Sequence, residues 1–155
     1  INKSRQIWWK IRPHLNYRTV EFRMCDVQRS LSNTKLIVSI IQALVHRIIN
    51  DSKCDASNYN NEYLNDSLWK ASSKGFDCLI IDPFTSEKLT MKDMIYRLID
   101  YISPSLKYFN NYDCIDTLNN IIENGTECDN QLDIYNKYGF KGLKKYLMDN
   151  VEYSL

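Results

Sequence analysis

The chain has 155 residues, of which 44% are hydrophobic and 25% are charged, a composition typical of a single globular domain with a buried core. The chain has 20 lysines and arginines and 19 aspartates and glutamates, so its net charge is only +1. A net charge this small does not indicate electrostatic binding to nucleic acid or to an acidic membrane. The five cysteines are scattered without a C-x-x-C pair, which disfavours a disulfide framework or a zinc site and predicts a cytoplasmic protein.

Two runs near the start, residues 7–12 and 19–25, alternate apolar and polar side chains and predict the two strands of an antiparallel hairpin. A loop of about six residues between them would place all polar side chains on one face and all apolar side chains on the other. That register pairs Arg12 with Thr19, Lys10 with Glu21, and Trp8 with Arg23.

The remainder, 33–151, is predicted to be mainly helical. The longest apolar run, 36–49, is too short and too polar to cross a membrane and is expected to form a buried helix. Caps and breakers predict a helix from the segment 30–34 to about Asn50, one over about 62–73, one from Met91 to Pro104, one around 115–122 that Gly125 stops, and two over about 129–138 and 141–151.

One further pair of extended segments is expected within 78–90, with its turn at Asp82 and Pro83. Thr90 and Asp93 then have the spacing of a capping box at the start of the next helix.

A lone two-stranded hairpin is only marginally stable in water, so further strands are expected beside the one over 7–25, on chain absent from this sequence or on another subunit. The absence of a methionine at Ile1 also suggests a piece of a longer protein. We therefore predict an α+β fold in which antiparallel strands of a larger sheet precede a helical C-terminal region. Residues 1–155 would form the C-terminal portion of one domain.

Four charged residues, Lys10, Arg12, Glu21 and Arg23, are expected to share the polar face of the hairpin. A carboxylate can bind a hard cation, and guanidinium groups can hold phosphate oxygens, which suits phosphoryl transfer. From spacing alone, a solvated sheet face with cross-strand salt bridges is the more common arrangement. His14, expected in the hairpin loop, is a candidate for substrate contact, whereas His46 in an apolar helix is expected to be a core histidine.

The motifs themselves resemble a known family. "WWKIRPH", "TVEFRMCD" and "IIQALV" are similar, in this order, to the C-terminal half of ATP-dependent carboxylate–amine ligases of the type 2 glutamate–cysteine ligase family, distant relatives of glutamine synthetase. Two later elements agree: a W-x-A-x-x-x-G segment at Trp69, Ala71 and Gly75, and a GT-x-x-D-x-Q segment at Gly125, Thr126, Asp129 and Gln131.

The resemblance implies a curved antiparallel sheet whose concave face holds ATP, Mg²⁺ and the acid substrate. Glu21 would be a Mg²⁺ ligand, and Arg23 and Arg12 would bind phosphate and act in catalysis. Arg12 and His14 would also contact the substrate. The reaction would phosphorylate a carboxylate, glutamate's γ-carboxylate in the type reaction, and an amine such as that of cysteine would then displace the phosphate. An N-terminal part of the protein would supply the other metal ligands, so this piece alone is expected to be inactive; a homodimer is left open.

The chain also departs from the family pattern. Ser67, Leu68 and Ser73 stand where the family has an Asn-Arg pair and a further arginine, Lys10 stands in place of a common acidic residue, and Asn130 stands in place of an arginine. Loss of these cations leaves open a second hypothesis, a non-catalytic relative that acts as a scaffold or interaction module. An independent small helical binding domain is the third.

Overall fold

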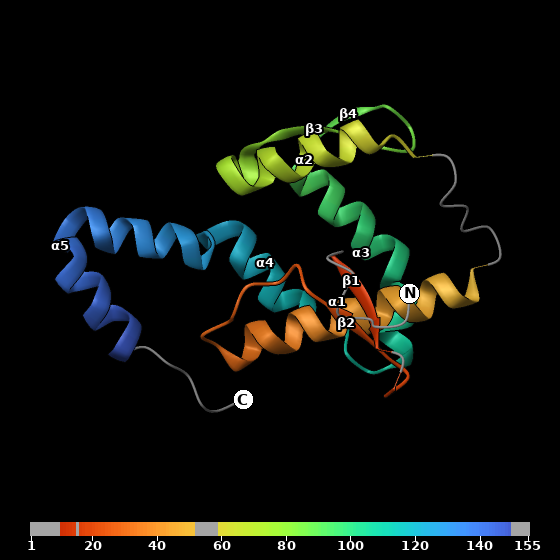
Figure 1. Ribbon diagram of the computed structural model, residues 1–155, viewed down its shortest axis with the longest axis horizontal. Helices are drawn as coiled ribbons and strands as arrows, with labels where there is room; N and C mark the ends of the chain where they lie inside the picture. Colours follow the sequence, from red (N-terminus) through yellow and green to blue (C-terminus); the bar gives the residue numbers. More distant parts are fainter. Residues whose placement is uncertain (1–9, 15, 52–58, 150–155) are drawn as a thin grey trace.

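The computed structural model describes residues 10–14, 16–51 and 59–149, and it confirms an α+β fold (Figure 1). Two small antiparallel sheets, β1–β2 and β3–β4, accompany five helices and one short 3₁₀ turn within the described ranges. The elements in chain order are β1 Ile11–His14, β2 Thr19–Phe22, α1 Leu31–Asn50, α2 Asn61–Lys74, η3 Gly75–Asp77, β3 Leu79–Ile81, β4 Lys88–Thr90, α3 Met91–Tyr108, α4 Cys114–Asn124 and α5 Glu127–Asp149.

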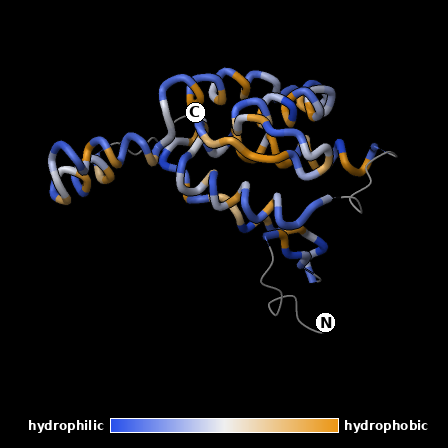
Figure 2. Tube along the Cα trace, turned by 90° about the horizontal axis from the view of Figure 1, so that it is seen from above, coloured by the Kyte–Doolittle hydropathy of each residue, from blue (hydrophilic) through white to orange (hydrophobic). Residues whose placement is uncertain are grey.

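The main hydrophobic core lies between α1, α3 and α4. Each of these helices has apolar side chains repeating at three- and four-residue spacing, so each presents an apolar stripe to the other two. The tube in Figure 2 shows these hydrophobic stretches in the middle of the molecule. The buried side chains are Leu36, Ala43, Ile99, Ile102, Leu106, Cys114 and Leu118.

A second, smaller core joins the β3–β4 hairpin to α2 and to the start of α3. Its buried residues are Cys78, Ile80 and Leu89. The expected pair of extended segments is therefore confirmed, with Leu79 opposite Thr90. The carboxylate of Asp82 accepts hydrogen bonds from the backbone N–H groups of Phe84 (2.8 Å) and Thr85 (3.1 Å), which closes the turn that follows β3.

Most predicted helices are confirmed, and their caps form as expected. Ser30 caps α1, and the capping box of Thr90 and Asp93 begins α3. The predicted end of this helix at Pro104 is wrong, because α3 continues to Tyr108. Burial of Ser105 and Leu106 holds the last turn in place despite the proline.

The last two predicted helices are confirmed as the two halves of α5, except that residues 150 and 151 lie outside the described residues. Gly139 separates them with a φ of 66° and a ψ of −167°, a conformation that is open essentially only to glycine. No residue of α5, which is described throughout, is buried. Figures 1 and 2 agree that α5 projects from the helical body.

The N-terminal hairpin forms, but with a register two residues away from the predicted one. Arg12 lies opposite Glu21 instead of Thr19, and His14 lies opposite Thr19. The strands continue closer to the turn than expected because Arg18 adopts a left-handed φ of 51° that lets the chain reverse sooner. A shift of two preserves which side chains share a face. The part of the predicted first strand over 7–9, including Trp8, lies outside the described residues.

None of the helices that the structure describes combines the length and the apolarity needed to span a membrane.

Candidate functional site

The polar face of the β1–β2 hairpin brings together the residues that the sequence singled out. Side chains alternate along each strand, so the register places a set of six on one side of the hairpin. We call this set the polar face: Lys10, Arg12, His14, Thr19, Glu21 and Arg23. The predicted site residues Arg12, His14, Glu21 and Arg23 therefore lie on one surface.

The carboxylate of Glu21 lies between two guanidinium groups. Arg12 Nε donates a hydrogen bond of 2.7 Å to Glu21 Oε2, and a second nitrogen of Arg12 contacts the same oxygen. Arg23 Nε lies 3.5 Å from the other oxygen, Oε1. Arg12 is the most buried of the three side chains, with 18% of it exposed. The Glu21 carboxylate thus orients the guanidinium groups of both Arg12 and Arg23.

Lys10 adds a third cation to this face. The backbone N–H of Arg23 donates a 2.9 Å hydrogen bond to the carbonyl oxygen of Lys10, so these two residues lie opposite each other on the neighbouring strands. The predicted pairing of Lys10 with Glu21 is therefore wrong, by the same two-residue shift. The Lys10 side chain is exposed and forms no ion pair with any residue that the structure describes.

His14 ends strand β1 instead of lying in the hairpin loop, which corrects the sequence prediction. Its ring lies 4.6 Å from the ring of Tyr17. The Nδ1 atom is buried, and no group in the described ranges forms a hydrogen bond with it. Its contact with substrate stays a prediction.

His46 is a half-buried histidine with partners, as expected for a structural residue. Its Nδ1 lies 3.0 Å from the hydroxyl of the buried Ser105, and its ring stacks on that of Tyr108 at 4.7 Å.

The polar face suits a metal only as a partial site. Across residues 10–14, 16–51 and 59–149, no group of three or more metal-binding side chains comes together. Glu21 alone would offer one carboxylate to a cation, an arrangement that suits Mg²⁺ because this ion is often held by one or two carboxylates plus phosphate oxygens. Guanidinium groups such as those beside Glu21 can form bidentate hydrogen bonds with phosphate oxygens.

The GT-x-x-D-x-Q element has a structural role. Thr126 and Asp129 form a capping box that begins α5, with a 2.7 Å hydrogen bond from the Thr126 N–H to the Asp129 carboxylate. The hydrogen bonds from Thr126 lower the pKa of Asp129. Gly125 ends α4 with a φ of 92°. These contacts account for Gly125, Thr126 and Asp129 of the pattern without placing them at the polar face.

The departures from the family pattern other than Lys10 lie on helices, and the hydroxyl oxygen of Ser67 is buried without a hydrogen-bond partner among the described residues. Ser67, Leu68 and Ser73 are on α2, where Leu68 is half exposed and the Ser73 hydroxyl donates to the carbonyl of Lys70 at 3.2 Å. Asn130 is exposed in the first turn of α5.

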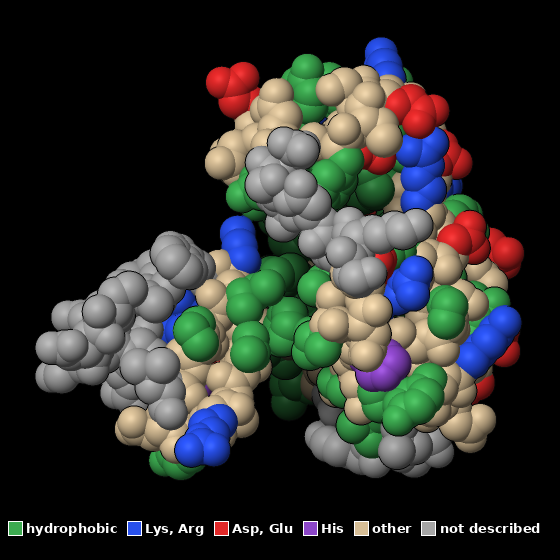
Figure 3. All heavy atoms as spheres, turned by 90° about the vertical axis from the view of Figure 1, so that its right-hand side faces the viewer, with side chains coloured by type: hydrophobic (Ala, Val, Ile, Leu, Met, Phe, Trp, Pro, Cys, Tyr) green, Lys and Arg blue, Asp and Glu red, His purple; other side chains and the backbone are tan. Residues whose placement is uncertain are grey.

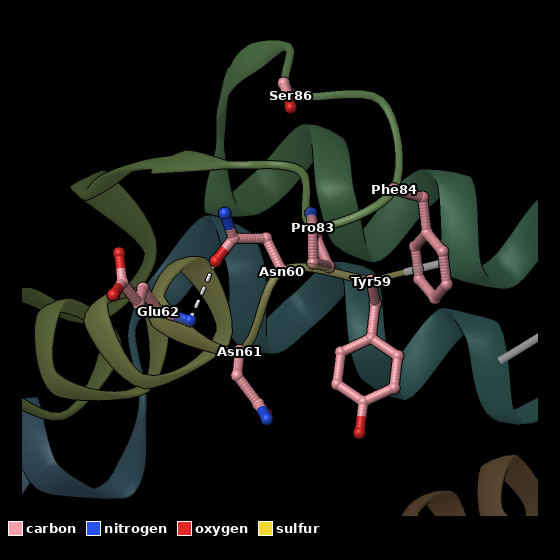
Figure 4. Close-up of a pocket in the computed structure, with 7 residues that line it drawn as sticks. All are labelled: Tyr59, Asn60, Asn61, Glu62, Pro83, Phe84 and Ser86. Atoms are coloured by element: carbon pink, nitrogen blue, oxygen red, sulfur yellow. Dashed lines mark hydrogen bonds between the residues drawn. The ribbon is translucent and has the colours of Figure 1, made fainter. Parts of the chain in front are cut away.

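A shallow hollow of about 670 Å³, which no sequence motif indicated, lies between the start of α2 and the β3–β4 turn (Figure 4). The rings of Tyr59 and Phe84 lie on one side of it, with centroids 6.5 Å apart. Asn60 caps α2 by accepting a 2.9 Å hydrogen bond from the N–H of Glu62. Two of the polar residues that line the hollow have structural roles, because Asn60 caps α2 and the Ser86 N–H donates to the Asp82 carbonyl in the turn.

Comparison with known proteins identifies relatives over almost the whole chain. A family model described as glutamate–cysteine ligase family 2 (GCS2) matches residues 1–143. A protein of Solibacter usitatus (strain Ellin6076) named "Putative glutamate--cysteine ligase 2" is 27% identical over 158 residues, which cover 100% of this chain and 41% of that protein. Proteins of the same name from Sorangium cellulosum (strain So ce56) and Chloroflexus aurantiacus (strain ATCC 29366 / DSM 635 / J-10-fl) are 26% and 25% identical over 137 residues, 87% of this chain, and are covered to 36% and 35%.

The chain thus spans roughly two fifths of the length of the curated relatives that it matches. A site formed by the whole of such a relative would include residues beyond those in this chain.

Proposed function

Because the chain belongs to glutamate–cysteine ligase family 2, we propose that it supplies the C-terminal part of a ligase that uses ATP and Mg²⁺ to join a carboxylate to an amine. The acid substrate would be glutamate, through its γ-carboxylate, and the acceptor would be cysteine or another amino acid. One observation carries the proposal: Arg12 and Arg23 flank the Glu21 carboxylate on a single face of the hairpin.

Glu21 and the two arginines would have different roles in phosphoryl transfer. Arg12 and Arg23 would orient the terminal phosphate and stabilise the negative charge that develops on its oxygens, which is the main contribution a protein makes to this reaction. Glu21 would be one ligand of Mg²⁺, and this ion would neutralise charge on the phosphates when bound.

The contacts in the structure imply an exchange of partners. Glu21 Oε2 accepts from Arg12, so Arg12 would have to turn from this carboxylate towards phosphate when the nucleotide binds. A guanidinium group can make this change without losing charge-assisted hydrogen bonds, because phosphate oxygens replace the carboxylate oxygen.

Measurement of ADP release by the full-length protein, with glutamate and cysteine as substrates, tests this proposal. We expect Glu21→Ala and Arg23→Ala each to lower kcat/KM by about 100-fold or more, because each removes a group that acts on charge in the transition state. Glu123→Ala and Lys88→Ala, at exposed positions on other elements, are the matched controls and should retain activity. Full activity of Glu21→Ala would contradict the metal assignment.

The departures at Ser67, Leu68, Ser73 and Asn130 favour a second candidate, a non-catalytic relative that serves as a scaffold. This candidate requires that the full-length protein bind no Mg²⁺–ATP. Calorimetric titration separates the two candidates, because micromolar binding of Mg²⁺–ATP would rule out the non-catalytic relative.

A further inference from the structure

The polar face carries more positive charge than its own carboxylate can balance. Lys10, Arg12 and Arg23 provide three cationic groups, and Glu21 is the one acidic side chain of the six-residue set. The whole chain has a net charge of only +1, so this excess is a local feature of the hairpin.

The pairing of Lys10 with Arg23 concentrates that excess. Like charges directly opposite each other on antiparallel strands destabilise the pair. Glu21 forms an ion pair with Arg23 through Oε1 and accepts a hydrogen bond from Arg12 through Oε2. The single negative charge of Glu21 is therefore already shared by two arginines and does not balance the charge of Lys10. An anion placed between Lys10 and Arg23 would relieve this repulsion.

We propose that Lys10 binds a phosphate group of the nucleotide together with Arg23, as a third cation beside Arg12; this rests on the function proposed above. A phosphate group suits the position better than a carboxylate because it carries up to two negative charges and three acceptor oxygens. The ammonium group of lysine is a compact charge with three donors on a flexible stem, so Lys10 can reach an oxygen that the planar arginines leave unbound.

Calorimetric titration of the full-length protein with Mg²⁺–ATP tests the role of Lys10. We expect Lys10→Gln to raise the Kd for Mg²⁺–ATP about tenfold, the effect of losing one charge-assisted hydrogen bond. Lys10→Arg should bring the Kd back to within about threefold of the wild-type value, because the charge is restored. Lys88→Gln, an exposed lysine on strand β4, is the matched control and should leave the Kd unchanged.

The outcomes separate this inference from the function on which it rests. Wild-type binding of Mg²⁺–ATP with an unchanged Kd in Lys10→Gln would overturn the role of Lys10 and leave the proposed function standing. Absence of binding by the wild-type protein would overturn both. A loss of glutamate affinity in Lys10→Gln with unchanged ATP affinity would overturn the phosphate assignment. Since Lys10 is exposed, these variants should fold, which circular dichroism checks.

Discussion

The described cysteines divide sharply by environment. Cys78 and Cys114 are only 1% and 3% exposed and pack in the two hydrophobic cores. Burial, together with the neighbouring carboxylate of Asp113, raises the pKa of the Cys114 thiol. Cys25 and Cys128 are exposed. Because the thiolate is the reactive form and needs access to a reagent, the two classes should differ in reactivity.

We therefore expect Cys25 and Cys128 to be alkylated about 100-fold faster than Cys78 and Cys114 in the folded protein, because the buried pair reacts only after local opening. Pulsed alkylation followed by peptide mass spectrometry measures each site. The same experiment in concentrated urea is the control, where the rates should converge. Equal rates without urea would show that the cores are open.

At the residue scale, part of the polar face could be predicted from the sequence. Alternation along a strand is set by the pleat, so the grouping of Arg12, Glu21 and Arg23 on one face could be predicted from their spacing. Their partners could not, because pairing depends on how early the turn closes. That in turn depends on the left-handed conformation of Arg18, and arginine gives no signal for it.

At the scale of elements, α3 shows where local rules fail. Proline has no N–H and its ring crowds the preceding turn, so the sequence predicted an end at Pro104. The helix continues because the next residues, Ser105 and Leu106, are 2% and 0% exposed and contribute to packing between α3 and α1. Tertiary packing outweighs a local penalty of about 3 kcal/mol. By contrast, caps such as Thr90 with Asp93 are short-range features and were predictable.

Replacement of this exposed proline should therefore stabilise the protein. We expect Pro104→Ala to raise the free energy of unfolding by about 1–3 kcal/mol, because alanine restores a helical N–H and removes the steric conflict. Urea unfolding followed by circular dichroism measures the change. Asp100→Ala, one turn earlier and also exposed, controls for helix propensity alone. A loss of stability in Pro104→Ala would mean that the packing of Ser105 depends on the proline.

At the scale of the whole molecule, apolar side chains remain on the surface in two places. The hairpin exposes Ile11, Val20 and Met24, and α1 exposes a stripe of apolar residues along one side of the helix. That stripe comprises Val38, Val45, Ile48 and Ile49. Figure 3 shows hydrophobic side chains at the surface between the hairpin, on the left, and the helices. Such a surface agrees with the prediction that the hairpin belongs to a larger sheet, with further strands beside it.

Polar contacts, and not a buried hydrophobic core, attach α5 to the rest of the molecule. Arg29, just before α1, forms an ion pair with Glu127 at the start of α5, and its guanidinium lies 4.2 Å from the ring centroid of Tyr146 in the second half of α5. The Tyr146 hydroxyl also donates to Glu127, at 3.3 Å. These three residues join the two halves of α5 to the helical body. No sequence pattern predicts this cluster, since its members are about 20 to 120 positions apart.

If this cluster fixes α5, removing its carboxylate should loosen the helix locally. We expect Glu127→Ala to speed amide hydrogen exchange over 140–149 about tenfold, because the lost charge-assisted contacts are not backed by buried apolar side chains in α5. Exchange in α1, α3 and α4 should stay unchanged, since their core does not include Glu127. Glu123→Ala, an exposed glutamate near the end of α4, is the matched control. Faster exchange throughout the chain would mean that Glu127 contributes to the stability of the whole protein and not to α5 alone. Unchanged exchange in α5 would mean that other contacts attach this helix.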